Sequence, residues 1–292
     1  MNVSASAAPA SVAAAYERCA EITTHEARNF SYGIRLLPDE KRQAMSALYA
    51  FARRVDDVGD GVLPAAAKLE ALESLRVAVR AAAGGQPSGD DPVLVALADA
   101  LARFPIPPSA LEELVSGCEM DCRQQRYETY DELSVYCRRV AGTIGRCSLG
   151  VFGSTEPDIA PALADTLGIA LQMTNILRDL VEDRDVMGRV YLPREDLERF
   201  GCSPEMRGTP EARCELVRFE AARAEAAYGE GLQLLDLLDR RSRACVAAMA
   251  GIYHRLLRRI EADPLAVFSS RVSLPSAEKA WVAARSLVGV GA

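Results

Sequence analysis

Apolar residues recur at three- and four-residue spacing along nearly the whole chain, a periodicity typical of amphipathic α-helices. No segment alternates apolar and polar residues convincingly, as a half-buried strand would. The abundant Ala, Leu, Arg and Glu residues also favour helices. We therefore predict an all-α protein. The expected helices span about 11–28, 39–58, 64–82, 93–103, 109–125, 131–151, 160–184, 211–240, 241–262 and 275–287.

The breaks between these helices are short, and no shift in composition or internal repeat divides the 292 residues. We therefore expect a single helical domain over residues 13–288. Residues 1–12, which are rich in Ala and Ser, are expected to form a flexible N-terminal lead without the basic start of a signal peptide.

Composition argues against several classes of function. A net charge of −7 argues against a nucleic-acid partner and against docking on an anionic membrane through a polybasic patch. No uninterrupted apolar run approaches the length of a membrane span. The eight cysteines form no C-x-x-C pair, so they are expected to be free thiols in a reducing compartment. We expect a cytoplasmic protein.

The first informative motif is a polar stripe on the helix expected over residues 39–58. At 100° per residue, Tyr49, Arg53, Asp56 and Asp60 share one face of this helix, whereas Asp57 points elsewhere. Two carboxylates one turn apart repel each other on an isolated helix, which favours a bound cation. A solvated surface with ordinary Arg–Asp pairs is the alternative interpretation.

A second stripe lies on the helix expected over residues 160–184. Gln172, Asn175, Asp179 and Asp183 follow one another at i, i+3, i+7 and i+11, amid apolar residues. These side chains offer only oxygen ligands of the kind that Mg²⁺ prefers.

Two other residues beside the second stripe, Arg178 and Glu182, have the spacing of an ordinary helical ion pair. This pair is an alternative to a catalytic role for Glu182.

Taken together, the two stripes indicate a more specific site than either does alone. Facing helices of this kind would gather four carboxylates around one cavity, a charge that needs divalent cations and an anionic substrate. Mg²⁺ typically binds one or two carboxylates together with phosphate oxygens of the substrate. Because the chain has no P-loop and no G-x-G-x-x-G motif, a diphosphate ester is expected rather than a nucleotide.

The segments that carry these stripes resemble the two aspartate motifs of the squalene/phytoene synthase family, the head-to-head prenyltransferases. YAFARRVDDVGD is similar to the first motif, and LQMTNILRDLVEDRDVMGRVYLP to the second with the R-x-Y-L-P that follows it. Residues 27–38, 136–153 and 252–275 also resemble segments of this family, so the similarity covers nearly the whole chain.

The resemblance implies one α-helical isoprenoid-synthase domain with a central cavity and two or three Mg²⁺ ions. The residues that it implies for the metal ions are Asp56, Asp60, Asn175, Asp179 and Asp183. Those that it implies for substrate diphosphate are Arg28, Arg53, Gln172, Asn175, Arg178 and Arg271. Those that it implies for the reaction centre are Tyr49, Arg53, Tyr136, Arg178 and Tyr253.

One segment departs from the family pattern. The family often has a His-Ser-Lys-Ser/Thr-like tetrad shortly before the position of Phe30, whereas this chain has Glu26, Ala27, Arg28 and Asn29. Arg28 is expected to take the place of the lysine on a diphosphate, and the departure puts a phosphate contact by Glu26 in doubt.

The resemblance implies the joining of two isoprenyl diphosphates through a cyclopropylcarbinyl diphosphate. The pattern is most similar to bacterial presqualene diphosphate synthases, which condense two farnesyl diphosphates and use no NADPH. Phytoene synthase, which condenses two geranylgeranyl diphosphates, is the alternative, because GCEMDCRQQRYETYDEL resembles that branch. A non-catalytic helical scaffold is a rival from another class. The sequence leaves the oligomeric state open, along with weak peripheral contact with a bilayer.

Overall fold

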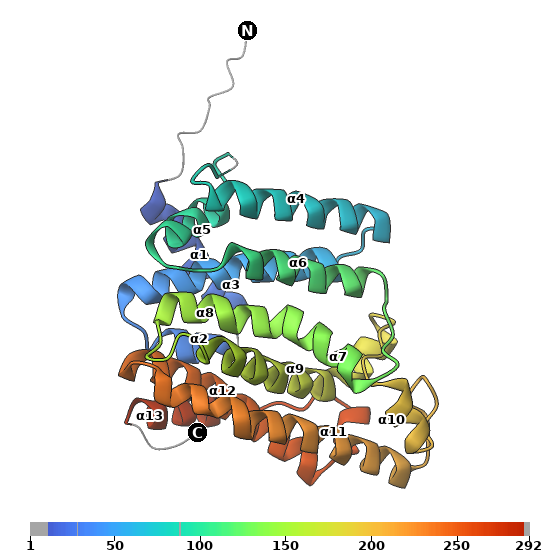
Figure 1. The fold of residues 1–292 in the computed structure, drawn as a ribbon. Helices are drawn as coiled ribbons and strands as arrows, with labels where there is room; N and C mark the ends of the chain where they lie inside the picture. Colours follow the sequence, from blue (N-terminus) through green and yellow to red (C-terminus); the bar gives the residue numbers. More distant parts are fainter. Residues whose placement is uncertain (1–10, 28, 88, 289–292) are drawn as a thin grey trace.

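The computed structural model describes residues 11–27, 29–87 and 89–288, and these residues form helices and connecting segments without a strand (Figure 1). In chain order the α-helices are α1 (Val12–Glu26), α2 (Phe30–Ile34), α3 (Asp39–Asp60), α4 (Ala65–Ala83), α5 (Pro92–Arg103), α6 (Pro108–Cys122), α7 (Tyr130–Cys137), α8 (Thr143–Phe152), α9 (Ala160–Asp185), α10 (Arg194–Arg199), α11 (Pro210–Gly231), α12 (Arg240–Ala262) and α13 (Ser276–Leu287). Shorter helical turns are the π-helical η1 (Arg138–Gly142) and the 3₁₀-helical η2 (Leu232–Leu237) and η3 (Ala266–Phe268).

The predicted all-α class is confirmed, and each predicted long helix corresponds to one or more observed helices. Differences occur where a helix changes type or is short. The helix predicted over 131–151 contains the π-helical turn η1, and the helix predicted over 211–240 ends as α-helix at Gly231. The short helices α2 and α10 were not predicted, because one or two turns are too few to establish a periodicity.

The long helices lie side by side, as Figure 1 shows for α4, α6, α8, α9, α12 and α11 from top to bottom. Helix α3 packs against α6 and α8, which in turn connect to α9 directly or through η1. The helices that carry the two predicted stripes, α3 and α9, therefore lie on opposite sides of a space that α6, η1 and α8 help to close. None of the described helices is long and apolar enough to cross a membrane.

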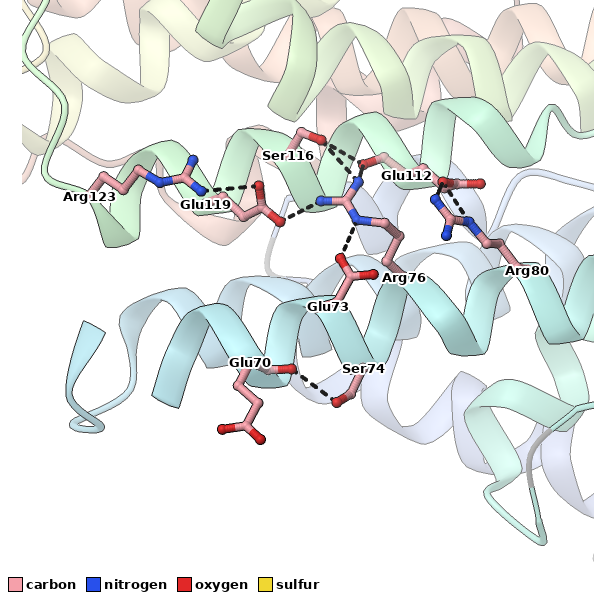
Figure 2. A network of polar contacts seen from close by, with 9 residues as sticks. All are labelled: Glu70, Glu73, Ser74, Arg76, Arg80, Glu112, Ser116, Glu119 and Arg123. Carbon is pink, nitrogen blue, oxygen red and sulfur yellow. Dashed lines mark hydrogen bonds and ion pairs between the residues drawn. The ribbon is translucent and has the colours of Figure 1, made fainter. Parts of the chain in front are cut away.

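A polar network joins α4 to α6 (Figure 2). The Arg76 guanidinium pairs with Glu73 at 2.9 Å and with Glu119, and it donates hydrogen bonds to the Glu112 carbonyl and the Ser116 hydroxyl at 3.0 and 3.1 Å. Arg76 is largely buried, so its charge is compensated where water is scarce. The network anchors α6 against α4.

A second buried group of charges joins α10 to α11. The Arg223 guanidinium pairs with Asp196 and lies 3.2 Å from Glu220, and both carboxylates are almost completely buried. Burial and, after it, the neighbouring Asp196 carboxylate raise the pKa of Glu220 to about 8 from its ordinary value of 4.5. Two carboxylates thus share one guanidinium, and Glu220 holds a proton near neutral pH.

We expect Glu220→Gln to stabilise the protein at alkaline pH. The folded chain keeps a proton that the unfolded chain releases, so the free energy of unfolding falls as pH rises from about 4.5 to about 8. The glutamine cannot ionise, and its gain over wild type should be larger at pH 8.5 than at pH 5 by on the order of 1–2 kcal/mol. Urea unfolding at both pH values measures this difference. The exposed Glu215→Gln serves as the matched control on α11, and an equal effect of Glu220→Gln at both pH values would contradict the assignment.

Candidate active site

Two adjoining cavities of opposite character lie between α3 and α9. The Asp56, Val140, Gln172 and Asn175 side chains line both of them. The first cavity is mainly apolar and extends away from these residues between α3, α8, α9 and α12. The second is polar and contains the predicted aspartates. The site therefore combines an apolar cavity with an adjoining cavity that is lined by charged residues.

The first stripe lies along the wall of both cavities. Tyr49 and Arg53 line the apolar cavity, Asp60 lines the polar one, and Asp56 stands between them. Asp57 points away from both cavities and forms an ion pair with Arg53 at 2.7 Å. The alternative interpretation, a solvated surface with Arg–Asp pairs, therefore accounts for the Arg53–Asp57 ion pair. It does not account for Asp56 and Asp60, which face the cavity.

The second stripe faces the same space from α9. Gln172 and Asn175 line both cavities, and Asp179 and Asp183 line the polar one. The Asn175 side-chain amide donates a hydrogen bond of 3.4 Å to the Gln172 Oε1 atom. The structure therefore brings the four aspartates of the two stripes to one cavity, as their helical spacing predicts.

Arginines cluster at the α9 side of the polar cavity. The Arg178 Nε atom donates to the neighbouring Asp179 carboxylate at 2.8 Å, and the Arg271 Nε atom approaches the same carboxylate at 2.9 Å. Glu182 lies 3.7 Å from Arg271. The alternative Arg178–Glu182 helical pair is therefore replaced by contacts with Asp179 and Arg271. The predicted Arg28 lies outside the described residues.

Three predicted tyrosines take two different places. Tyr49 and Tyr253 both pack against Phe30, with ring centroids 6.3 and 5.6 Å from it, beside the apolar cavity. Burial raises the pKa of Tyr49 to about 12, so its hydroxyl stays neutral. Tyr136 instead lines the polar cavity.

The sequence analysis missed a carboxylate on α6 and a tyrosine after α9. The Tyr136 and Tyr191 hydroxyls each donate to one oxygen of Asp121, at 3.0 and 2.8 Å, and lie 3.2 Å from each other. Burial raises the pKa of Asp121 above its ordinary value. All three side chains line the polar cavity. One feature of the sequence could have identified Asp121 as a site residue: it is a charged residue among apolar residues and cysteines near the end of α6.

Arg189, also missed, closes the polar cavity between the two stripes. Its guanidinium donates to the Asp60 carboxylate at 2.8 Å and to the Gly59 carbonyl at 3.0 Å. The Lys68 ammonium donates to the same carbonyl at 2.7 Å. These cations also suit the negative C-terminal end of α3. Arg189 and Tyr191 belong to the R-x-Y-L-P segment, whose side chains had been assigned no role.

The carboxylates of the polar cavity repel one another. Asp56 is exposed to the cavity, while the protein atoms that enclose the cavity reduce its solvation. Burial and then the Asp60 charge raise its pKa to about 7. Burial and then the Asp179 charge likewise raise the pKa of Asp183 to about 7. Arg189 offsets part of this repulsion, and further positive charge in the cavity would relieve the rest.

The donor set fits divalent cations that a diphosphate bridges. The Asn175 Oδ1 atom is buried without a hydrogen-bond partner, which leaves an oxygen ready to accept a contact at the junction of the cavities. Among the described residues, no three His, Cys, Asp or Glu side chains converge as a ready-made metal cage. Mg²⁺ does not need such a cage, because it binds one or two carboxylates plus water and phosphate oxygens.

Comparisons with known proteins agree with this arrangement. The family model for squalene/phytoene synthase matches residues 23–278. A phytoene synthase of Mycobacterium tuberculosis is 48% identical over 279 residues, which cover 94% of this chain and 90% of that protein. A phytoene synthase of Arthrospira platensis is 37% identical and covers 93% of this chain and 92% of its own.

Solved structures have the same fold. A dehydrosqualene synthase, crystallised with a ligand, superposes with a TM-score of 0.86 at 28% identity, covering 96% of this chain and 97% of its own. The squalene synthase HpnC from Alicyclobacillus acidocaldarius has a TM-score of 0.79 at 29% identity and covers 87% and 96%. Members of this family are prenyltransferases that use divalent metal to bind diphosphate. The chain belongs to the squalene/phytoene synthase family, whose enzymes condense prenyl diphosphates head to head.

Proposed function

We propose that this protein is a magnesium-dependent phytoene synthase, which condenses two molecules of geranylgeranyl diphosphate head to head. The observation that carries the proposal is the 48% identity, over 94% of the chain, to a protein named phytoene synthase. The sequence analysis favoured farnesyl diphosphate and presqualene diphosphate, with phytoene synthase as the alternative. The curated relatives favour the alternative, whereas the structures of squalene-type enzymes are only 28% and 29% identical.

The length of the apolar cavity is compatible with a long tail. It reaches from Asp56 to Met45 along α3. These residues are eleven positions apart, or about 16 Å of helix at 1.5 Å per residue. On the facing helix the lining extends from Asn175 to Ala164, the same distance. A chain of several isoprene units is therefore the substrate class that fits this chamber.

We assign the diphosphate end to the polar cavity. The residues proposed to hold Mg²⁺ are Asp56, Asp60, Asn175, Asp179 and Asp183. When bound, the metal would supply Lewis-acid charge that stabilises the departing diphosphate. Arg53, Arg178 and Arg271 are proposed to contact diphosphate oxygens, with Gln172 and Asn175 at the junction.

The apolar cavity would protect the reaction from water. Loss of diphosphate from one substrate leaves an allylic cation. The double bond of the second substrate attacks this cation, and loss of a proton from the resulting tertiary cation closes the ring to give a cyclopropylcarbinyl diphosphate. Ionisation of this intermediate and loss of a proton then give the hydrocarbon without a reductant. The neutral Tyr49 hydroxyl lines the chamber where positive charge would develop, and the ring of Tyr253 packs behind Phe30, which also lines it. The Tyr136 hydroxyl is hydrogen-bonded to Asp121 and Tyr191, and it is proposed to hold or move a proton beside the diphosphate.

The proposal predicts the product of a direct incubation. The purified protein is given Mg²⁺ without nicotinamide, with geranylgeranyl and farnesyl diphosphate offered separately, and products are identified by mass spectrometry. We expect a forty-carbon hydrocarbon from geranylgeranyl diphosphate, with kcat/KM at least about tenfold above that for farnesyl diphosphate.

Two other results would contradict this assignment. A thirty-carbon product that still carries diphosphate, formed faster from farnesyl diphosphate, would restore the presqualene diphosphate assignment. Absence of any condensation product from either substrate would favour the non-catalytic scaffold.

A further inference from the structure

The outward face of the C-terminal helix α13 is apolar. The opposite face is buried against α12, where Gly251 permits close approach: a Cβ atom at this position would lie 3.0 Å from Val282. The outward side chains recur at i, i+4, i+7 and i+11, so they form one stripe. They are Ala277, Trp281, Ala284 and Val288, all exposed.

Trp281 is the single tryptophan of the chain, and it lies between two arginines. The guanidinium carbons of Arg255 and Arg285 stand 4.6 and 4.5 Å from its ring centroid, while 46% of the residue stays exposed. Val288, one helical turn beyond Ala284, is 72% exposed. We refer to the apolar stripe and these two arginines as the α13 face. A large aromatic held outward between cations, in an apolar surface, is typical of a contact surface.

The surroundings of the α13 face are cationic although the chain has a net charge of −7. Arg259 lies one turn after Arg255 on α12. The Glu278 carboxylate compensates Arg255 at 3.1 Å and Arg259 at 2.6 Å. Within the described part of the chain, no carboxylate forms an ion pair with Arg285. The local charge is therefore complementary to an anionic surface.

A small cleft lined by Arg178, Arg271, Leu274 and Lys279 lies between α13 and the diphosphate end of the candidate active site. Lys279 is two positions from Trp281, so it points to the opposite side of α13. The helix therefore stands between this cleft and the α13 face.

We propose that the α13 face docks on the anionic headgroup layer of a lipid bilayer. Indole rings prefer the boundary between headgroups and acyl chains, and guanidinium groups pair with lipid phosphates. The purpose of docking rests on the proposed function, because long-tailed substrates and a hydrocarbon product partition into bilayers. A second copy of the chain fits the α13 face less well. The arginines of the two copies would repel each other, and the alanine-rich stripe is narrow for the interface of a stable dimer.

Vesicle binding tests this proposal, and Trp281 reports it without a label. The full-length protein is titrated with vesicles of phosphatidylglycerol or of phosphatidylcholine at low salt, while tryptophan emission and cosedimentation are recorded. We expect a blue shift and cosedimentation with phosphatidylglycerol, both weakened by salt. Arg285→Glu and Trp281→Ala should each lower the partition coefficient by about tenfold in cosedimentation.

Arg218→Glu is the matched control, because Arg218 is exposed on α11, away from the α13 face, and should leave binding unchanged. Equal vesicle binding by wild type and Arg285→Glu would overturn the proposal, as would absence of a shift with phosphatidylglycerol. A blue shift that follows protein concentration without lipid would assign the face to self-association instead. Turnover in detergent micelles is measured in parallel, so failure of the proposed function is distinguishable from failure of docking.

Discussion

Asp56→Ala and Asp179→Ala are each expected to lower kcat by at least about a thousandfold while leaving the fold intact. Each aspartate comes from a different stripe and lines the same polar cavity. Loss of either would remove a ligand for the cations that must neutralise the departing diphosphate. Steady-state turnover of geranylgeranyl diphosphate at saturating Mg²⁺ measures the effect.

Stability supplies the control for these variants. Asp56 is strained by reduced solvation inside the cavity and by Asp60, so its removal should leave the melting temperature of the metal-free protein unchanged or higher. Asp185→Ala, at the exposed end of α9 and outside the cavities, should keep turnover within about twofold of wild type. Retention of more than about a tenth of wild-type turnover by both Asp56→Ala and Asp179→Ala would refute the site.

Gly168→Ala is expected to destabilise the protein by at least about 2 kcal/mol. A Cβ atom at this position would lie 2.5 Å from the Gly142 nitrogen and 2.7 Å from the Ala141 carbonyl carbon, both backbone atoms of η1. Backbone cannot rotate away as a side chain can, so α9 must move from η1. Chemical unfolding of wild type and variant gives the difference in free energy.

Gly229→Ala is the matched substitution on α11. A Cβ atom there meets nothing within 4 Å, and the alanine should stabilise the helix by up to about 1 kcal/mol. The two substitutions should change the free energy of unfolding in opposite directions, which distinguishes the effect of close packing from that of helix propensity. Equal effects of the two substitutions would contradict the close contact between α9 and η1.

The sequence predicted those parts of the fold and site that repeat with the helical period. The all-α class and the long helices follow from apolar periodicity. The Asp56–Asp60 and Asp179–Asp183 stripes follow from the 3.6-residue turn, because each lies within one helix. The same logic placed Asp57 off its stripe, where the structure has it.

The remainder depended on how separate helices meet. Asp121 becomes a site residue only because α6 turns it toward Tyr136 and Tyr191. Arg189 reaches Asp60 across 129 positions of sequence, a distance that no local pattern encodes. The π-helical turn η1 lies where Gly168 of α9 approaches its backbone closely. The sequence of residues 131–151 alone contains no sign of this contact. Tail length depends on the whole lining of the apolar cavity, which is why motif resemblance favoured a different substrate from the curated relatives.

The binding of inorganic diphosphate as a function of Mg²⁺ tests most directly whether the two stripes form one metal-dependent site. Isothermal titration calorimetry is performed on wild type and Asp179→Ala, with Mg²⁺ and with EDTA. We predict that wild type binds diphosphate only with Mg²⁺ and that Asp179→Ala loses most of this binding. Equal binding of diphosphate by wild type with Mg²⁺ and with EDTA, or undiminished binding by Asp179→Ala, would contradict the account.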